Sequence, residues 1–276
     1  MLDSYFQHKA DLADIECNFR CPDDCNAPGC WMDDVIIEVN LFDLIKLSPV
    51  LDTPVSILFS QYCRLGLLNC EFNPRYKRLL IKLKKPCLFL MGKRCLVHDS
   101  KPLNCVLFPE YQQIKGLLPE LSRNPIFYTF PCLKKPIFVS DKRNNALKEL
   151  RRMCLREEAL SCYYLFGVSS FIVDSKPLKK KLKRNNPNNR VFSLQDYDRL
   201  LYEKLRSSGF FESIMEKISI LDERTRKENI FEKLNDSVMM RRLLEDMTRP
   251  QVVHRLESEH IKRLKRNLLP PAIVFM

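Results

Sequence analysis

Residues 86–111 read PCLFLMGKRCLVHDSKPLNCVLFPEY, and this stretch decides how the first half of the chain is expected to fold. It places Cys87, Cys95 and Cys105 with seven and then nine residues between them. The prolines in and after the stretch disfavour regular strands and helices, so something other than backbone ladders must hold it together. A metal ion bound by the thiols would supply that constraint.

Two further groups of cysteines lie outward from this stretch. Residues 19–31, FRCPDDCNAPGCW, contain three cysteines. A single further cysteine ends residues 127–132, FYTFPC. Thiolates bind soft and borderline metals, and four sulfurs in a tetrahedral array suit either zinc or an iron–sulfur cluster. Seven positions exceed one four-ligand site and fall one short of two sites, so both arrangements stay open. The predicted metal ligands are Cys21, Cys25, Cys30, Cys87, Cys95, Cys105 and Cys132.

The remaining cysteines in apolar surroundings are expected to have a different role. Cys63, Cys70, Cys154 and Cys162 are predicted to be buried small hydrophobic residues, as free cysteine commonly is. His98 lies between two of the predicted ligands, where an imidazole ligand would be chemically reasonable. We favour a surface or packing role for it.

The composition is that of a globular protein. Of 276 residues, 45% are hydrophobic and 29% are charged. The first residues lack a signal-peptide pattern, and no apolar run of about 18 residues indicates a membrane span. We therefore expect a cytoplasmic protein with reduced cysteines rather than a disulfide framework. The glycines are too widely spaced for a phosphate-binding glycine-rich loop.

Positive charge is concentrated in the second half of the chain. Residues 1–140 carry 17 Lys and Arg against 15 Asp and Glu, whereas residues 141–276 carry 29 against 19. This excess indicates either an acidic partner, a protein or a nucleic acid, or merely a solvated exterior, and for the run from Lys179 to Arg184 we favour a solvated linker.

Local patterns in the first half predict short elements. Residues 35–39 and 78–85 are expected to be strands. Asn40 is expected to cap a helix with an acidic residue in its first turn, and a second helix begins near Pro54 and ends near Tyr62.

The second half shows longer helical patterns. Apolar spacing predicts a helix from residue 141 to a stop at Gly167. The basic segment 174–190 is expected to be an exposed linker. Ser193-x-x-Asp196 resembles a capping box that opens another helix, and apolar spacing over residues 214–264 predicts further helices.

Together these patterns predict an α+β protein. An irregular, cysteine-rich metal-binding domain is expected over residues 1–140, followed by a basic, mainly helical region over residues 141–276.

The cysteine blocks resemble the CxxCxxCC (YkgJ-type) cysteine-cluster family, whose domains are described as zinc- or iron-chelating. The resemblance covers roughly residues 17–135, and Trp31 stands where the family has a second, adjacent cysteine. It implies a thiolate metal centre, with an iron–sulfur cluster favoured over zinc. The positions that follow the family pattern are Cys87-Leu88-Phe89-Leu90, Gly92, Cys95, Pro102, Cys105 and Phe108-Pro109, whereas Lys101 and Val106 stand where the family has arginine.

Three functions are open on this basis. The leading hypothesis is a cytoplasmic metal-binding protein whose role in the cell the sequence does not specify. Bacterial flagellin lysine N-methylases carry a related domain, which implies an S-adenosylmethionine-dependent protein-lysine methyltransferase as an alternative. The third is a zinc-stapled module that binds nucleic acid or a protein through its basic helices.

Overall fold

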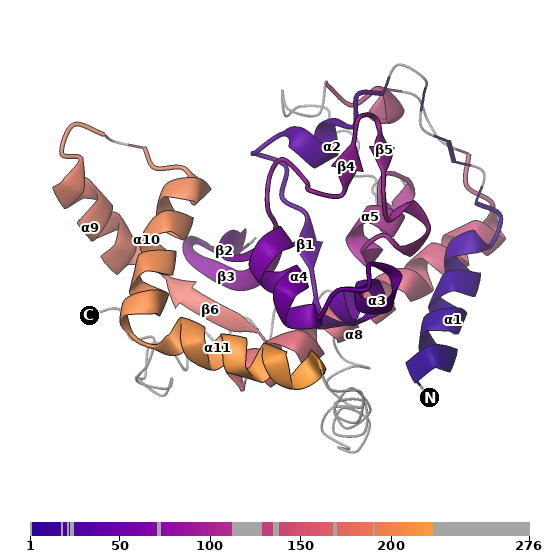
Figure 1. Ribbon diagram of the computed structural model, residues 1–276. Helices are drawn as coiled ribbons and strands as arrows, with labels where there is room; N and C mark the ends of the chain where they lie inside the picture. The colour runs from indigo at the N-terminus through magenta and orange to yellow at the C-terminus, as the bar shows by residue number, and fades with distance from the viewer. Residues whose placement is uncertain are drawn as a thin grey trace. The chain divides into compact units, whose positions relative to one another are not determined.

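The computed structural model describes residues 2–17, 19–20, 22, 25–70, 73–111, 129–134, 138–167, 170–189 and 191–222. Helices and small antiparallel sheets are combined in these residues, so the predicted α+β class is confirmed (Figure 1). The helices are α1 (Leu2–Asp14), α2 (Pro28–Trp31), α3 (Leu41–Val50), α4 (Val55–Tyr62), α5 (Leu103–Leu107), α8 (Asp141–Phe166), α9 (Ser175–Asn185), α10 (Leu194–Ser207) and α11 (Phe210–Ser219). The strands are β1 (Glu38–Val39), β2 (Cys63–Cys70), β3 (Asn73–Leu83), β4 (Leu90–Met91), β5 (Arg94–Cys95) and β6 (Phe171–Asp174). Short 3-10 helices are η1 (His98–Ser100), η3 (Pro131–Leu133) and η4 (Ile220–Asp222).

The chain divides into two compact units, and each takes two segments of the sequence. The first comprises Met1–Cys63 and Leu83–Glu157, and the second comprises Arg64–Lys82 and the chain from Glu158 onward. These divisions differ from the predicted boundary at residue 140, because β2 and most of β3 are grouped with the later segment. The metal-binding role predicted for residues 1–140 stays a prediction.

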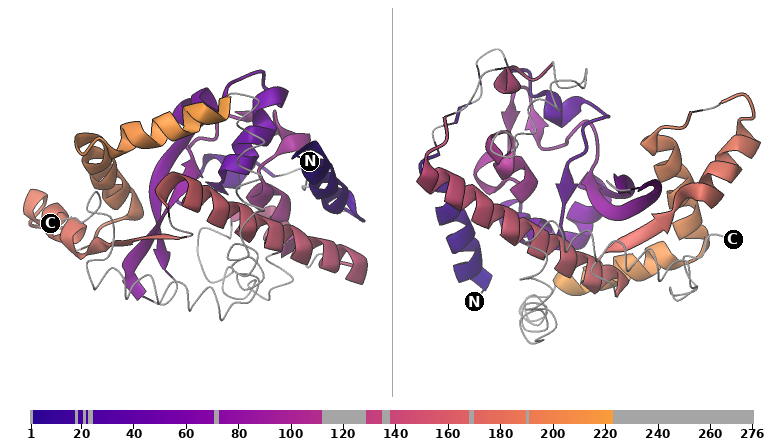
Figure 2. Two further views of the ribbon diagram at one scale, coloured as in Figure 1. Left: turned by 90° about the horizontal axis from the view of Figure 1, so that it is seen from below. Right: turned by 180° about the vertical axis from the view of Figure 1, so that it is seen from behind.

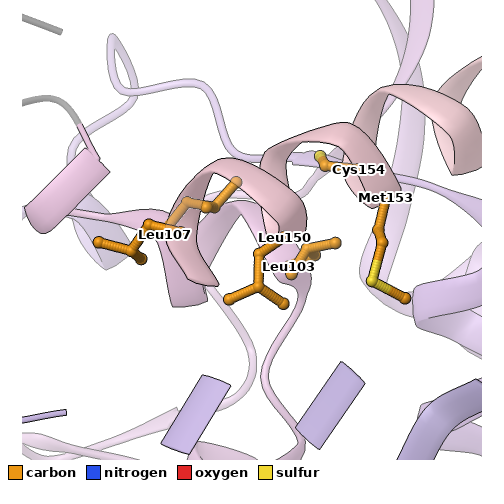
Figure 3. Close-up of a cluster of buried hydrophobic side chains, with 6 residues drawn as sticks. Leu103, Leu107, Leu150, Met153 and Cys154 are labelled. Carbon is orange, nitrogen blue, oxygen red and sulfur yellow. The ribbon is translucent and has the colours of Figure 1, made fainter. Parts of the chain in front are cut away.

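One hydrophobic core cluster of the first unit lies between α5 and α8 (Figure 3). Leu103 and Leu107 of α5 pack against residues of α8 spaced three and four apart, which places them on one helix face. Part of α1 also packs on this cluster, and Figure 2 shows α1 next to α8. The α8 residues are Leu147, Leu150, Met153 and Cys154.

Helix α3 begins where the sequence predicted. The Asn40 side chain accepts a hydrogen bond from the Asp43 amide at 3.1 Å, and the Asp43 carboxylate accepts one from the Asn40 amide at 3.2 Å. This reciprocal capping box satisfies two amides that have no partner within the helix. Helix α4 starts directly after Pro54, as predicted.

The sheet of the second unit is built around β3, which pairs with β2 and, antiparallel, with β6. The β3–β6 register runs from Tyr76 opposite Asp174 to Leu79 opposite Phe171. The sequence patterns predicted part of β3 but not β2. In the first unit, β1 pairs with the end of β3, where the Leu83 amide donates to the Ile37 carbonyl at 3.0 Å.

A buried ion pair fastens α10 to this sheet. Lys82 Nζ of β3 lies 2.9 Å from the Asp198 carboxylate of α10, and the same carboxylate accepts the Leu67 amide of β2 at 2.6 Å. Gly66 leaves room for the pair, since a Cβ there would lie 2.6 Å from Lys82 Cε.

Helix α9 corrects the prediction of an exposed linker over residues 174–190. The Asp174 side chain accepts the Lys176 amide at 2.9 Å and caps the helix. Leu178 and Leu182 lie one turn apart and are both buried, so the basic segment is amphipathic rather than fully solvated. The sequence did not indicate this amphipathic helix, because only two leucines interrupt a segment that is otherwise rich in lysine.

The later capping and stop signals are confirmed. Ser193 and Asp196 form the capping box of α10. Gly167 follows α8 with φ of 72°, a conformation that favours glycine. Helices predicted after residue 222 lie outside the described residues. In the part of the chain that is described, no helix is both long and apolar enough to cross a membrane.

Candidate metal centre

Four of the predicted ligands belong to the first unit and interact electrostatically there. Cys30 lies in α2, Cys87 just before β4, Cys95 in β5 and Cys105 in α5. The stretch that carries the last three is flanked by cis peptide bonds at Lys85–Pro86 and Phe108–Pro109. Cys21 falls outside the described residues.

Backbone contacts bring the two ends of this group together. The Cys87 amide donates to the Cys30 carbonyl at 2.7 Å. The Lys85 ammonium donates to the neighbouring Gly29 carbonyl. The Trp31 indole donates to the Asn26 carbonyl at 2.9 Å, which braces the loop before α2. The first cysteine group is therefore fixed against the start of the second.

The surroundings of the Cys87 sulfur favour its ionised form. The Cys30 thiol and the backbone amides of Phe89 and Leu90 act to lower the pKa of Cys87 to about 6, and the Leu90 amide donates to the Cys87 carbonyl at 3.0 Å. The Lys85 ammonium acts in the same direction. The Cys30 pKa is raised, because its thiol donates to Cys87 and is partly buried. The two shifts favour ionisation of Cys87 while Cys30 keeps its proton.

Cys95 and Cys105 complete the group at longer range. Cys95 lies opposite Leu90 in the β4–β5 hairpin, and its sulfur accepts the Val97 amide. Burial raises the pKa of Cys105 to about 12, and the charge of Cys87 adds to this effect. Both thiols are therefore within electrostatic range of Cys87.

A buried polar network positions the helix that carries Cys105. The Asp43 carboxylate accepts the amide of Leu103, the first residue of α5, at 3.0 Å. Asp43 lies 3.9 Å from Lys9, which in turn lies 2.7 Å from Glu157. Sequence reasoning identified Asp43 only as a helix cap, because its second partner lies far along the chain.

Lys85 is a second residue of this site that the sequence predictions missed. Burial lowers its pKa, whereas the thiols of Cys30, Cys87 and Cys105 act to raise it. The only local signal was a lysine two residues before a predicted ligand. Its charge offsets negative charge that thiolates would bring to this site.

The other predicted ligands are placed less directly. Cys25 is half-buried, and its amide donates to the Pro22 carbonyl at 2.9 Å. Cys132 is buried in η3, two residues after Phe130. The Phe130 ring lies 3.4 Å from the position that a Cβ on Gly29 would take, so this segment reaches helix α2, which carries Cys30.

The fit to a metal is partial. Within the described ranges, no group of three or more His, Cys, Asp or Glu side chains is arranged to hold a metal ion. The donor chemistry nevertheless suits a thiophilic metal, because the Cys30–Cys87 pair offers two adjacent sulfurs and a stabilised thiolate. Cys63, Cys70 and Cys154 are buried, as predicted, whereas Cys162, for which burial was also predicted, is half-buried. His98 is exposed on η1.

Comparisons of the chain with protein-family models, with curated proteins and with solved structures gave no match. The resemblance to the cysteine-cluster family and the methyltransferase alternative therefore stay predictions from the sequence.

Proposed function

We propose that this chain is a metal-binding protein whose thiolate centre is built on Cys30 and Cys87. Cys95 and Cys105 are the nearest further donors, and Cys21, Cys25 and Cys132 are the remaining candidates. The group bound is an iron–sulfur cluster or zinc. The observation that carries this proposal is the contact between two cysteines that are distant in the sequence. The Cys87 amide donates to the Cys30 carbonyl at 2.7 Å, and the Cys30 thiol acts to lower the pKa of Cys87.

The positions of the Phe89 and Leu90 amides support a ligand role. They belong to the second and third residues after Cys87, and the Val97 amide stands in the same relation to Cys95. Amides directed at a sulfur favour its ionised form, which is the form that binds metal. Hydrogen bonds of this kind also orient metal ligands and tune the bound metal.

The surrounding backbone gives a second reason. The segment from Lys85 to Leu107 contains only a two-residue hairpin, a 3-10 turn and a five-residue helix. Bound metal would supply cross-links between these short elements, and its binding energy would contribute to folding. Without metal, the Cys30–Cys87 contact, the Asp43 hydrogen bond and the α5 core residues hold the segment.

The test is anaerobic purification followed by elemental analysis and a visible absorption spectrum. We expect stoichiometric metal. Iron with absorbance near about 400 nm would identify a cluster, and a colourless zinc protein would identify the other group. Cys87→Ser and Cys105→Ser should each lower the metal affinity at least about tenfold, since outer-shell changes alone cost that much, and chelator competition measures this loss.

Cys162→Ser is the matched control, because Cys162 is half-buried, desolvation raises the pKa of its thiol to about 12, and it belongs to the second unit. Its metal content should equal that of the unmodified chain. If Cys87→Ser does not fold, alkylation of the unmodified chain with and without chelator replaces it. Chelation should expose Cys30, Cys87 and Cys105 to the reagent.

Two results would overturn the proposal. One is a chain that folds without metal and is unaffected by chelators. The other is a Cys30–Cys87 disulfide in protein purified without oxygen.

A further inference from the structure

Helix α9 presents a dense array of positive charge to solvent. Its sequence, SKPLKKKLKRN, contains no acidic residue. A helix of this length extends about 16 Å at 1.5 Å per residue, so the charges are closely spaced. The exposed cations are Lys176, Lys179, Lys180, Lys181, Lys183 and Arg184.

The opposite side of the helix is fixed within the second unit. Leu178 and Leu182 are buried, and α9 packs against α10 (Figure 1). At its start, the Ser175 hydroxyl donates to the Arg75 carbonyl of β3 at 2.6 Å, and the Asp174 carboxylate binds the Arg75 guanidinium. The cations are therefore held on a rigid element rather than on a linker.

These cations are not used within the described structure. Among the described residues, no ion pair joins a side chain of α9 to a carboxylate. Placing six like charges on one short helix is unfavourable in isolation, because like charges three or four residues apart repel each other. An external polyanion would relieve that repulsion.

We propose that the exposed face of α9 binds the phosphate backbone of a nucleic acid without reading its bases. Lysine is a point charge that suits phosphate contacts of this kind. Phosphate contacts position a protein on nucleic acid and carry no sequence information themselves. Duplex DNA carries one charge per about 1.7 Å of its axis, which a row of lysines on a 16 Å helix can match.

Two other polyanionic partners fit less well. A protein partner is disfavoured because lysine is depleted in protein–protein interfaces, and five of the six cations are lysine. A membrane surface is disfavoured because a helix that lies in a bilayer inserts an apolar face. The two leucines of α9 are already buried in the protein.

The experiment measures binding of the full chain to a fluorescent 20-base-pair DNA duplex of mixed sequence over 50–200 mM salt. The test variant is Lys179→Gln with Lys180→Gln and Lys183→Gln. Each phosphate contact contributes about 0.9 to the slope of log K against log salt, so the variant should lose about 2–3 from the slope. We expect its affinity at 100 mM salt to fall at least about tenfold.

The control variant is Lys142→Gln with Lys148→Gln and Arg152→Gln, which removes three exposed charges from α8. It lowers the net charge equally and should keep most of the affinity. Equal losses in both variants would overturn the proposal, because they would show only the effect of net charge. Absence of salt-dependent binding, or binding to anionic vesicles in place of DNA, would also overturn it.

Metal content is measured on the same samples. The α9 variant should retain the metal of the unmodified chain, since α9 belongs to the second unit and the proposed ligands belong to the first. Failure of the nucleic-acid proposal is thereby distinguished from failure of the metal proposal.

Discussion

Each compact unit buries one lysine against carboxylates, and the two lysines are held differently. In the first unit, Lys9 lies 2.7 Å from Glu157 and 3.9 Å from Asp43, so one ammonium faces two carboxylates. In the second unit, Lys82 lies 2.9 Å from the Asp198 carboxylate. Both lysines are 3% exposed, so these charges are removed from water in both units.

Each buried lysine lies near a proposed functional region: the Lys9 network near the helix of Cys105, and the Lys82 pair near the basic helix α9. Burial raises the pKa of Asp43 to about 6, and the nearby Lys9 ammonium limits that rise. The first unit has two carboxylates for one ammonium. One of them, Asp43, also accepts the first amide of α5, the helix that carries Cys105. The Lys82–Asp198 pair holds α10, which packs against α9. The protonation state of Asp43, and with it the charge of the first unit's network, therefore changes near pH 6.

The largest effect is expected from breaking the pair in the second unit. Asp198→Ala leaves Lys82 buried without its carboxylate and removes the acceptor of the Leu67 amide. We expect the free energy of unfolding to fall by about 3–5 kcal/mol, as it does when one partner of a buried ion pair is removed. Urea denaturation at pH 7 measures this, with hydrogen exchange of α10 as a local probe.

The double variant Lys82→Met with Asp198→Leu is the control for this prediction. It removes both charges and should recover most of the lost stability, because an apolar pair of similar volume carries no desolvation cost. A cost below about 1 kcal/mol for Asp198→Ala alone would show that the pair is not the anchor of α10.

A somewhat smaller, pH-dependent effect is expected from Lys9→Met. The variant leaves Glu157 and Asp43 buried without their cation, and we expect a loss of about 2–4 kcal/mol at pH 7. The loss is limited because Asp43 can take up a proton in place of the lost charge. Metal retention should weaken together with stability, since the same network holds α5.

The sign of the pH dependence follows from the raised pKa of Asp43. A carboxyl group with a raised pKa favours folding while it is protonated, and that contribution is lost as the pH rises through about 6. Without Lys9 the Asp43 pKa rises further, so the cost of Lys9→Met should grow between pH 5 and pH 7. Thermal denaturation of both chains across this range measures it, and a cost that shrinks with rising pH would contradict the network.

The smallest effect is expected at the helix caps, where the two units can be compared directly. Ser193→Ala removes an exposed cap on α10 and should cost about 1 kcal/mol. Asn40→Ala should cost more, because the Asn40 side chain is buried and also donates to Glu157 at 3.1 Å. Chemical denaturation measures both, with Gln195→Ala on α10 as the control. Equal costs would show that the buried network adds nothing to the first cap.

These caps also show what could be predicted from the sequence. Asn40 and Ser193 were correctly predicted because capping depends on residues three positions apart. The long helix that ends at Gly167 was predicted for a similar reason, since apolar spacing and a glycine stop are local signals.

Two elements show where local signals were insufficient. Helix α9 was predicted to be a linker, because nothing nearby in the sequence shows that Leu178 and Leu182 have a surface to pack against. Strand β2 was not predicted, because its residues 63–70 lack alternation, and pairing with β3 is what gives it an extended conformation.

The sequence by itself determined the α+β class and the capped helices, and it supplied the cysteines that we propose as metal ligands. Only the tertiary structure decided that Cys30 meets Cys87, that Asp43 holds the helix of Cys105, and that α9 exposes its cations on a fixed helix. The physical reason is the range of the interactions. Caps and apolar periodicity act within one or two helical turns, whereas a thiol pair or a buried charge network exists only after distant segments have packed together.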